Sequence, residues 1–144
     1  MGTFEVFDHT ADVGLSIRAE SLPDLLETAA RAVFAQVLED LPPEVEAEEV
    51  VAVKVEGETA GDLGELLVSW LQELLFRFET RRQVPIGFEF EEAAADRARA
   101  RVGFGRFDPR RHRARAEVKG VTYHELDVHA EADGSWRARV ILDV

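Results

Sequence analysis

Apolar side chains recur every three or four residues in two segments of the chain, which predicts two amphipathic helices. These segments are residues 21–40 and residues 59–80. Ser21 stands where it can cap the first helix, and Thr59 or Asp62 can cap the second, because short polar side chains accept hydrogen bonds from free N–H groups at a helix start. Since both apolar stripes need burial, we expect both helices to share one core.

The rest of the chain alternates between apolar and polar residues with a period of two, which is typical of half-buried strands. The expected strands are residues 4–10, 12–19, 50–58, 86–92, 97–104, 111–118, 121–132 and 135–143. A hairpin turn signal, Asp133-Gly134, separates the last two. The sequence therefore predicts an α+β fold: a mostly antiparallel β-sheet with two amphipathic helices on one face, in a single domain of residues 1–144.

Composition excludes several classes of site. The 144 residues contain no cysteine, so disulfides, thiolate zinc sites and cysteine nucleophiles are absent. No apolar run reaches the length of a membrane span and no signal peptide is recognisable, so we expect a cytoplasmic protein without membrane contact. The net charge is −12, and residues 1–62 alone carry 15 acidic and 3 basic residues. This acidic half would repel phosphate backbones.

Arginines occupy every second position in three places, mostly with alanine between them, and side chains two apart on a strand share a face. These rows are Arg97, Arg99 and Arg101; Arg111, Arg113 and Arg115; and Arg137 and Arg139. Aromatic residues do not interleave with them, as a base-stacking surface would require. We interpret the rows as solvated sheet faces, with Glu89 and Glu91 as cross-strand partners, and expect weak or no direct RNA binding.

The densest polar cluster lies near the start of the chain, in the stretch "FDHTADVG". Asp8, His9, Thr10 and Asp12 fall within five positions there, and Gly14 follows. A tight turn would explain them, because Asp and Thr side chains accept hydrogen bonds from nearby backbone N–H groups. A hydrolytic site would need a nucleophile beside the histidine, and zinc would need paired nitrogen or sulfur ligands, neither of which is evident.

Oxygen ligands suit this cluster better, because hard cations such as Ca²⁺ and Mg²⁺ bind carboxylates, carbonyls and water. A second acidic group must come from elsewhere, and the chain ends in "RVILDV", with Asp143 followed by Val144 and its carboxylate. If the first and last strands meet in the sheet, Asp12, Asp143 and Val144 would converge. A turn and a cation site both remain open on these grounds.

Four segments in order resemble the archease family over essentially the whole chain. They read "DHTADVG", "LLVSWLQELLFRFE", "KGVTYHELDV" and "VILDV". In the third, archeases usually have alanine where this chain has Gly120, whereas Lys119, Thr122, Tyr123 and His124 match. Any one segment is weak by itself, but four in register at this length are specific.

The resemblance implies an accessory protein, not an enzyme, that activates the GTP-dependent, tRNA-splicing RNA ligase of the RtcB type. Archeases promote guanylylation of that ligase, sustain its turnover and broaden its nucleotide use. Their metal-binding residues match Asp12, Asp143 and Val144 here, which implies a divalent cation. We expect Ca²⁺ first, with Mg²⁺ or Mn²⁺ as alternatives.

Residues around that set have less defined expectations. His9 and Thr10 are expected to shape the turn, while Asp8, His9, Lys119 and His124 are candidates for supporting the ligands or contacting the partner. A chaperone-like modulator of RNA-modifying enzymes, such as tRNA methyltransferases, is the main functional alternative. A free-standing metal-dependent hydrolase is disfavoured, because no obvious general base accompanies the carboxylates.

Overall fold

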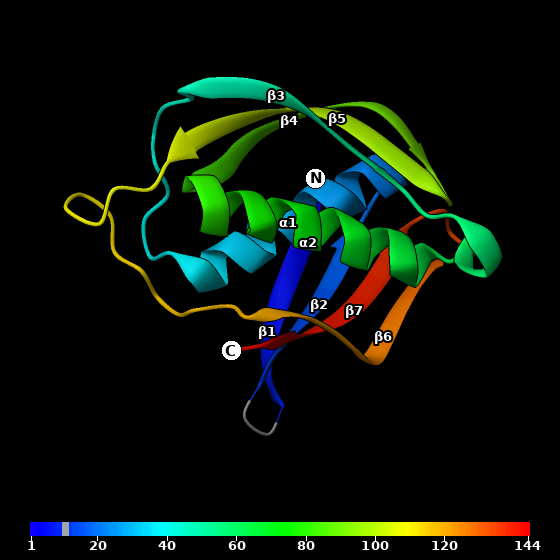
Figure 1. Ribbon diagram of the computed structural model, residues 1–144. Helices are drawn as coiled ribbons and strands as arrows, with labels where there is room; N and C mark the ends of the chain where they lie inside the picture. Colours follow the sequence, from blue (N-terminus) through cyan, green and yellow to red (C-terminus); the bar gives the residue numbers. More distant parts are fainter. Residues whose placement is uncertain (10–11) are drawn as a thin grey trace.

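Two antiparallel sheets enclose a layer of two helices (Figure 1). The structure is a computed structural model that describes residues 1–9 and 12–144, the side chain of His9 excepted. In chain order the elements are β1 (Thr3–His9), β2 (Asp12–Ala19), α1 (Leu22–Val37), β3 (Ala47–Lys54), a 3₁₀ turn (Gly57–Thr59), α2 (Leu63–Arg81), β4 (Gln83–Ala94), β5 (Arg97–Arg106), β6 (Gly120–Ala130) and β7 (Trp136–Asp143).

The first sheet has the strand order β1-β2-β7-β6, and the second has the order β3-β5-β4. Every neighbouring pair is antiparallel. In the first sheet β2 pairs with β7, which brings together strands from near the two ends of the chain. Neither of the described helices is long and apolar enough to cross a membrane.

The predicted α+β class with two helices and antiparallel strands is confirmed, and the structure adds that the strands form two sheets instead of one. The width of the apolar surface on α2 explains the second sheet. Leu66 and Val68 point to nearly opposite sides of the helix, and both are buried. Trp70 packs against Phe88 and Phe90 of β4 and donates its indole N–H to the Leu26 carbonyl of α1 at 2.9 Å. One sheet could cover only half of such a helix.

Helix starts follow the sequence-based expectation. The Ser21 hydroxyl accepts a hydrogen bond from the Asp24 N–H at 3.1 Å, which caps α1. Of the two candidates for α2, Asp62 is the cap, because its carboxylate accepts from the Gly64 N–H at 2.9 Å. Each cap satisfies an N–H group that has no partner inside its helix.

The connection from β5 to β6, residues 107–119, is called the strap here, and its predicted strand at residues 111–118 is wrong. The strap forms only an isolated bridge between Ala114 and Leu38. It covers the C-terminal end of α1, where the Arg115 N–H donates to the Val37 carbonyl at 2.7 Å. Free carbonyls at a helix end need donors. The strap supplies them, and so it runs along the helix end and not along a sheet.

Gly14 has a packing role that its place in the polar cluster did not reveal. It lies opposite Phe7 in the β1–β2 ladder, and a Cβ at position 14 would overlap the Phe7 ring. The Arg139 guanidinium lies over the Phe7 ring, 4.2 Å from its centroid. Ile141, opposite Gly14 on β7, is completely buried although it points away from the helices. The open face of the first sheet thus has a small apolar cluster of its own.

We predict that Gly14→Ala lowers the free energy of unfolding by about 1–3 kcal/mol, the usual range for an overpacked site. Gly120→Ala is the matched control, because a Cβ there meets nothing within 4 Å. Urea denaturation measures both variants. In a Phe7→Ala background, Gly14→Ala should be nearly neutral, because the ring that it would overlap is gone. Equal losses of stability in Gly14→Ala and Gly120→Ala would contradict the assignment.

Candidate metal site

The motif segments from the two ends of the chain meet at one end of the first sheet. His9 pairs with Asp12 across the β1–β2 hairpin, and Gly120 pairs with Asp143 between β6 and β7. The β2–β7 ladder ends at Val13 and Leu142. Continuing that antiparallel register by one pair places Asp12 opposite Asp143. A single row across four strands therefore contains residues from three of the sequence motifs.

Both carboxylates of this row lie on the open face of the sheet. Side chains alternate along a strand, and Leu142 points into the core, as Val13 does less completely. Asp12 and Asp143 therefore point the other way, away from the helices. Asp143 is exposed and Asp12 is partly exposed. Directly opposite residues are close enough to interact, so two negative charges share one site there.

The end of the chain is held beside these carboxylates. The Lys119 N–H donates to the main-chain carbonyl of Asp143 at 2.7 Å, which extends the sheet by one bond. Val144 is partly buried and packs against the core. These two anchors fix the main-chain oxygens of Val144 next to Asp143. The first strand, β1, does not meet the last strand in this sheet: it is β2 that lies between β1 and β7, and the β2–β7 pairing brings Asp12 next to Asp143.

Two other candidates near the row are placed differently. Asp8 pairs with Val13, so strand alternation directs its exposed side chain to the face opposite Asp12. Gly120, where the third motif departs from its usual alanine, has open space at the position of an added Cβ. The expectations for Thr10 and for the His9 side chain lie outside the described residues.

The third motif forms a bulge in β6 between Thr122 and Asp127, where the pairing with β7 is interrupted. Tyr123 leaves the sheet towards α2, and its hydroxyl donates to Glu65 at 3.3 Å. Partial desolvation, and then the Glu65 carboxylate, raise the pKa of Tyr123 above its ordinary value. His124 is exposed and lies 3.3 Å from Glu125 (Nε2 to Oε2), so the structure places it in the bulge and not in the Asp12–Asp143 row.

His129 sits in a second polar group further along β6, which the sequence did not single out as a candidate site. Its ring nitrogens lie 2.7 Å from Asp127 and 3.2 Å from Glu131. Hydrogen bonds to Glu131 and then to Asp127 raise the pKa of His129. The alternate spacing of the three residues, 127, 129 and 131, is the sequence signal that could have revealed the group, because residues two apart share a strand face.

The donor set of the Asp12–Asp143 row fits a hard cation. No group of three His, Cys, Asp or Glu residues suited to a metal occurs among the described residues. The row supplies two carboxylates, and Val144 follows Asp143 directly in the chain. Oxygen-only donors with open positions for water are the usual surroundings of Ca²⁺ and Mg²⁺ and are unlike those of structural zinc.

Comparison with known proteins gives consistent matches over the full length. The model of the Archease protein family (MTH1598/TM1083) matches residues 4–144. A protein named Protein archease from Methanopyrus kandleri is 40% identical over 144 residues, covering 98% of this chain and 99% of that protein. Its namesake from Pyrococcus abyssi is 33% identical over the whole of both. The solution structure of Methanobacterium thermoautotrophicum protein 1598 superposes with a TM-score of 0.74 at 32% identity, over 98% of each chain.

The adjacency of Asp12 and Asp143 makes a prediction that involves no metal. With divalent ions chelated, Asp143→Asn should raise the free energy of unfolding by about 0.2–1 kcal/mol, because like charges directly opposite each other on a sheet are destabilising. Asp8→Asn, on the other face of the sheet, is the control and should change it less. Chemical denaturation at low ionic strength measures the difference, and a loss of stability in Asp143→Asn would argue against the shared site.

Proposed function

Because this chain belongs to the archease family, we propose that it is a non-catalytic accessory protein that activates the GTP-dependent, tRNA-splicing RNA ligase of the RtcB type. In this role it promotes guanylylation of the ligase, sustains multiple turnover and broadens nucleotide use in the cytoplasm. The observation that carries the proposal is the β2–β7 register, which joins the first and last family motifs in one cross-strand row.

Asp12, Asp143 and the Val144 carboxylate are the residues that would hold a divalent cation, most simply Ca²⁺, with Mg²⁺ or Mn²⁺ as alternatives. A bound cation would neutralise the paired carboxylates and supply positive charge that attracts phosphate oxygens. The protein itself would contribute by holding the oxygen ligands in place. Antiparallel pairing holds the two aspartates opposite each other, and the anchored Val144 main chain brings the third donor alongside.

The exposure of this row supports a direct role towards the ligase. Asp143 is exposed on a sheet face that no helix covers. A cation needed only to stiffen the terminal strands could be enclosed, whereas one presented to a partner must remain accessible. The acidic N-terminal half, with 15 acidic and 3 basic residues in positions 1–62, would complement a basic surface on the ligase.

A chaperone-like modulator of RNA-modifying enzymes, such as tRNA methyltransferases, is the second candidate. The observation in its favour is apolar exposure on the edge strand β1, where Phe4 is 37% and Val6 is 50% exposed. Holding a partner soluble requires such a surface and needs neither a metal nor a nucleotide. The two candidates therefore differ in their dependence on the Asp12–Asp143 row.

We predict that the wild-type protein binds Ca²⁺ and that Asp12→Asn and Asp143→Asn each weaken the affinity at least tenfold, since each removes a charged oxygen ligand. Asp8→Asn should leave it unchanged. A peptide tag after Val144 should also weaken binding by converting the carboxylate into an amide, whereas the same tag before Met1 should not. Calorimetric titration compares the five proteins with wild type. Equal affinities throughout would remove the row as a metal site.

We also predict that a substoichiometric amount of this protein raises the number of RNA joints formed per ligase molecule and the yield of guanylylated ligase. The protein alone should join nothing. Asp12→Asn and Asp143→Asn should abolish the gain, and Asp8→Asn should preserve it. A titration with cognate ligase, GTP and cleaved RNA measures this. If all variants protect the ligase from aggregation equally and none raises guanylylation, the chaperone-like function is the correct one.

A further inference from the structure

Arginines on the two sheets are paired with carboxylates, as the interpretation of solvated faces required. Arg99 lies 3.4 Å from Glu91, and Arg101 lies 3.4 Å from Glu48. Arg97 has Asp96 at 3.2 Å. On the first sheet, Arg137 and Arg139 pair with Glu131 and Glu125 at 3.1 and 3.0 Å. Their positive charges are therefore largely neutralised within the protein.

The arginines of the strap differ from these. Arg110, Arg111, Arg113 and Arg115 are all exposed, and within the part of the chain that the structure describes none forms an ion pair or a side-chain hydrogen bond. The segment 110–115 contains no acidic residue and carries four positive charges, of which only Arg111 lines a cavity that also contains acidic side chains. This occurs in a protein with 29 acidic residues and a net charge of −12. The strap is thus a local cationic surface on an acidic molecule.

Hydrogen bonds fix the start of the strap in a defined turn. The Asp108 carboxylate accepts from the Arg110 N–H at 2.9 Å, and the Asp108 carbonyl accepts from the N–H groups of Arg111 and His112. The Asp108 N–H donates to Nδ1 of His112 at 2.9 Å. The Asp108 carboxylate is therefore hydrogen-bonded to the backbone, and among the described residues it forms no ion pair with the arginine side chains of the strap. Such pre-organisation reduces the entropy lost on binding.

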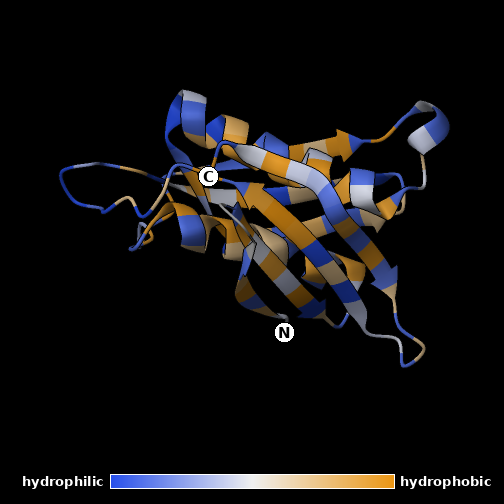
Figure 2. Ribbon diagram, turned by 90° about the horizontal axis from the view of Figure 1, so that it is seen from below, coloured by the Kyte–Doolittle hydropathy of each residue, from blue (hydrophilic) through white to orange (hydrophobic). Residues whose placement is uncertain are grey.

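The end of α1 fixes the rest of the strap. The Arg113 carbonyl accepts from the Glu39 N–H at 2.9 Å, and the Arg115 N–H donates to Val37 at 2.7 Å. These bonds use main-chain atoms only, so the side chains stay exposed. Figure 2 shows the strap as a hydrophilic loop that projects from one end of the molecule.

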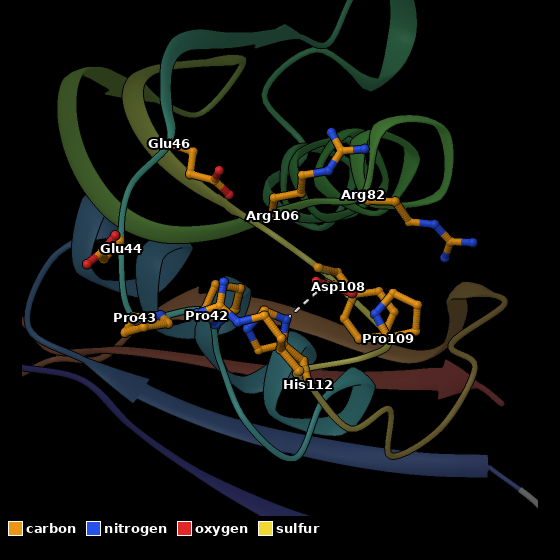
Figure 3. Close-up of a pocket in the computed structure, with 11 residues that line it drawn as sticks. Pro42, Pro43, Glu44, Glu46, Arg82, Arg106, Asp108, Pro109 and His112 are labelled. Carbon is orange, nitrogen blue, oxygen red and sulfur yellow. Dashed lines mark hydrogen bonds between the residues drawn. The ribbon is translucent and has the colours of Figure 1, made fainter.

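A cavity of about 490 Å³ lies behind this surface, but its charges are balanced. Its walls include Arg82, Arg106 and Arg111 as well as Glu44, Glu46 and Asp108. Figure 3 shows Arg82 and Arg106 on the side of the cavity away from Glu44. A balanced lining gives no preference for an anion. Arg110, Arg113 and Arg115 do not line this cavity, and the excess of positive charge lies at these three exposed residues.

We propose that the strap binds the phosphate backbone of an RNA strand, without reading its bases. Guanidinium groups suit phosphate oxygens, and four of them within six residues suit a ligand with several phosphates. Within the described strap, Phe107 is only 8% exposed with the Arg82 guanidinium over its ring, and His112 is partly buried with its ring beside Phe107, so neither ring is fully exposed for stacking on bases. The choice of RNA as the polyanion rests on the proposed function in RNA ligation.

An acidic protein surface fits the strap less well. Protein interfaces derive most of their affinity from buried apolar and aromatic anchors, and residues 110–115 offer only Ala114. Interfaces with nucleic acid are more polar and more strongly positive. The surrounding acidic surface would keep the binding weak, which agrees with the expectation of weak or no RNA binding and assigns what binding there is to one segment.

The test uses the protein alone, without ligase, nucleotide or metal, so its failure is separable from failure of the proposed function. Fluorescence anisotropy with a labelled 12-nucleotide single-stranded RNA should give a dissociation constant of about 10⁻⁴–10⁻⁶ M at physiological salt, and a smaller one at low salt. Arg110→Gln, Arg111→Gln and Arg113→Gln combined should weaken binding at least tenfold. In this variant, log K should also fall less steeply with log salt: the magnitude of the slope should decrease by about 2, since each lost phosphate contact on a single strand removes about 0.7.

Arg97→Gln, Arg99→Gln and Arg101→Gln combined form the matched control, with the same change in net charge at paired arginines. Its affinity should stay within about threefold of wild type. Equal losses in the two triple variants, or no RNA binding by wild type at low salt, would overturn the proposal. Polyglutamate that displaces RNA at equal charge concentration would identify an acidic protein as the partner, and GTP that does so would identify a free nucleotide. Melting curves establish that both variants are folded.

Discussion

The antiparallel ladder between β2 and β7 joins residues 13–19 to residues 136–142, and the other features of the first sheet depend on it. On its inner face, Leu15 opposes Val140, and both are completely buried against the helices. On its outer face the same ladder buries Ile141 beside Gly14 and sets Asp12 opposite Asp143. One set of main-chain hydrogen bonds therefore produces a hydrophobic contact on one side and a pair of carboxylates on the other.

Local features of the fold could be predicted from the sequence because their causes are local. Helix periodicity, the Ser21 and Asp62 caps and the turn at Asp133-Gly134 each involve residues within a few positions of one another. Convergence of Asp12 with Asp143 could be stated only as a condition. No pattern in either strand says which partner it will choose, and the family resemblance, not the periodicity, supplied that information.

The strap shows where alternation in a sequence is ambiguous. Arg111, Arg113 and Arg115 alternate with other residues just as the sheet arginines do, and an extended chain gives the same alternation whether or not it joins a sheet. What decides the outcome is the C-terminal end of α1, whose carbonyls take up the strap's N–H groups. The sequence also did not reveal that the strap arginines lack neutralising carboxylates. Arginines of β5 and β7 pair with carboxylates from neighbouring segments of the sheets, and the strap does not lie in a sheet.

Long-range pairing also governs when the carboxylate row can exist at all. Leu15 and Val140 are contacts of nearly maximal sequence separation, and such contacts form late, because the entropy of closing so large a loop must be met first. During synthesis β2 is made early and lacks one of its two partner strands until residues 136–142 have left the ribosome. A truncated or incompletely folded molecule therefore has one half of the row and cannot imitate the finished protein. Assembly of the row is thus a late event that follows the pairing of β2 with β7.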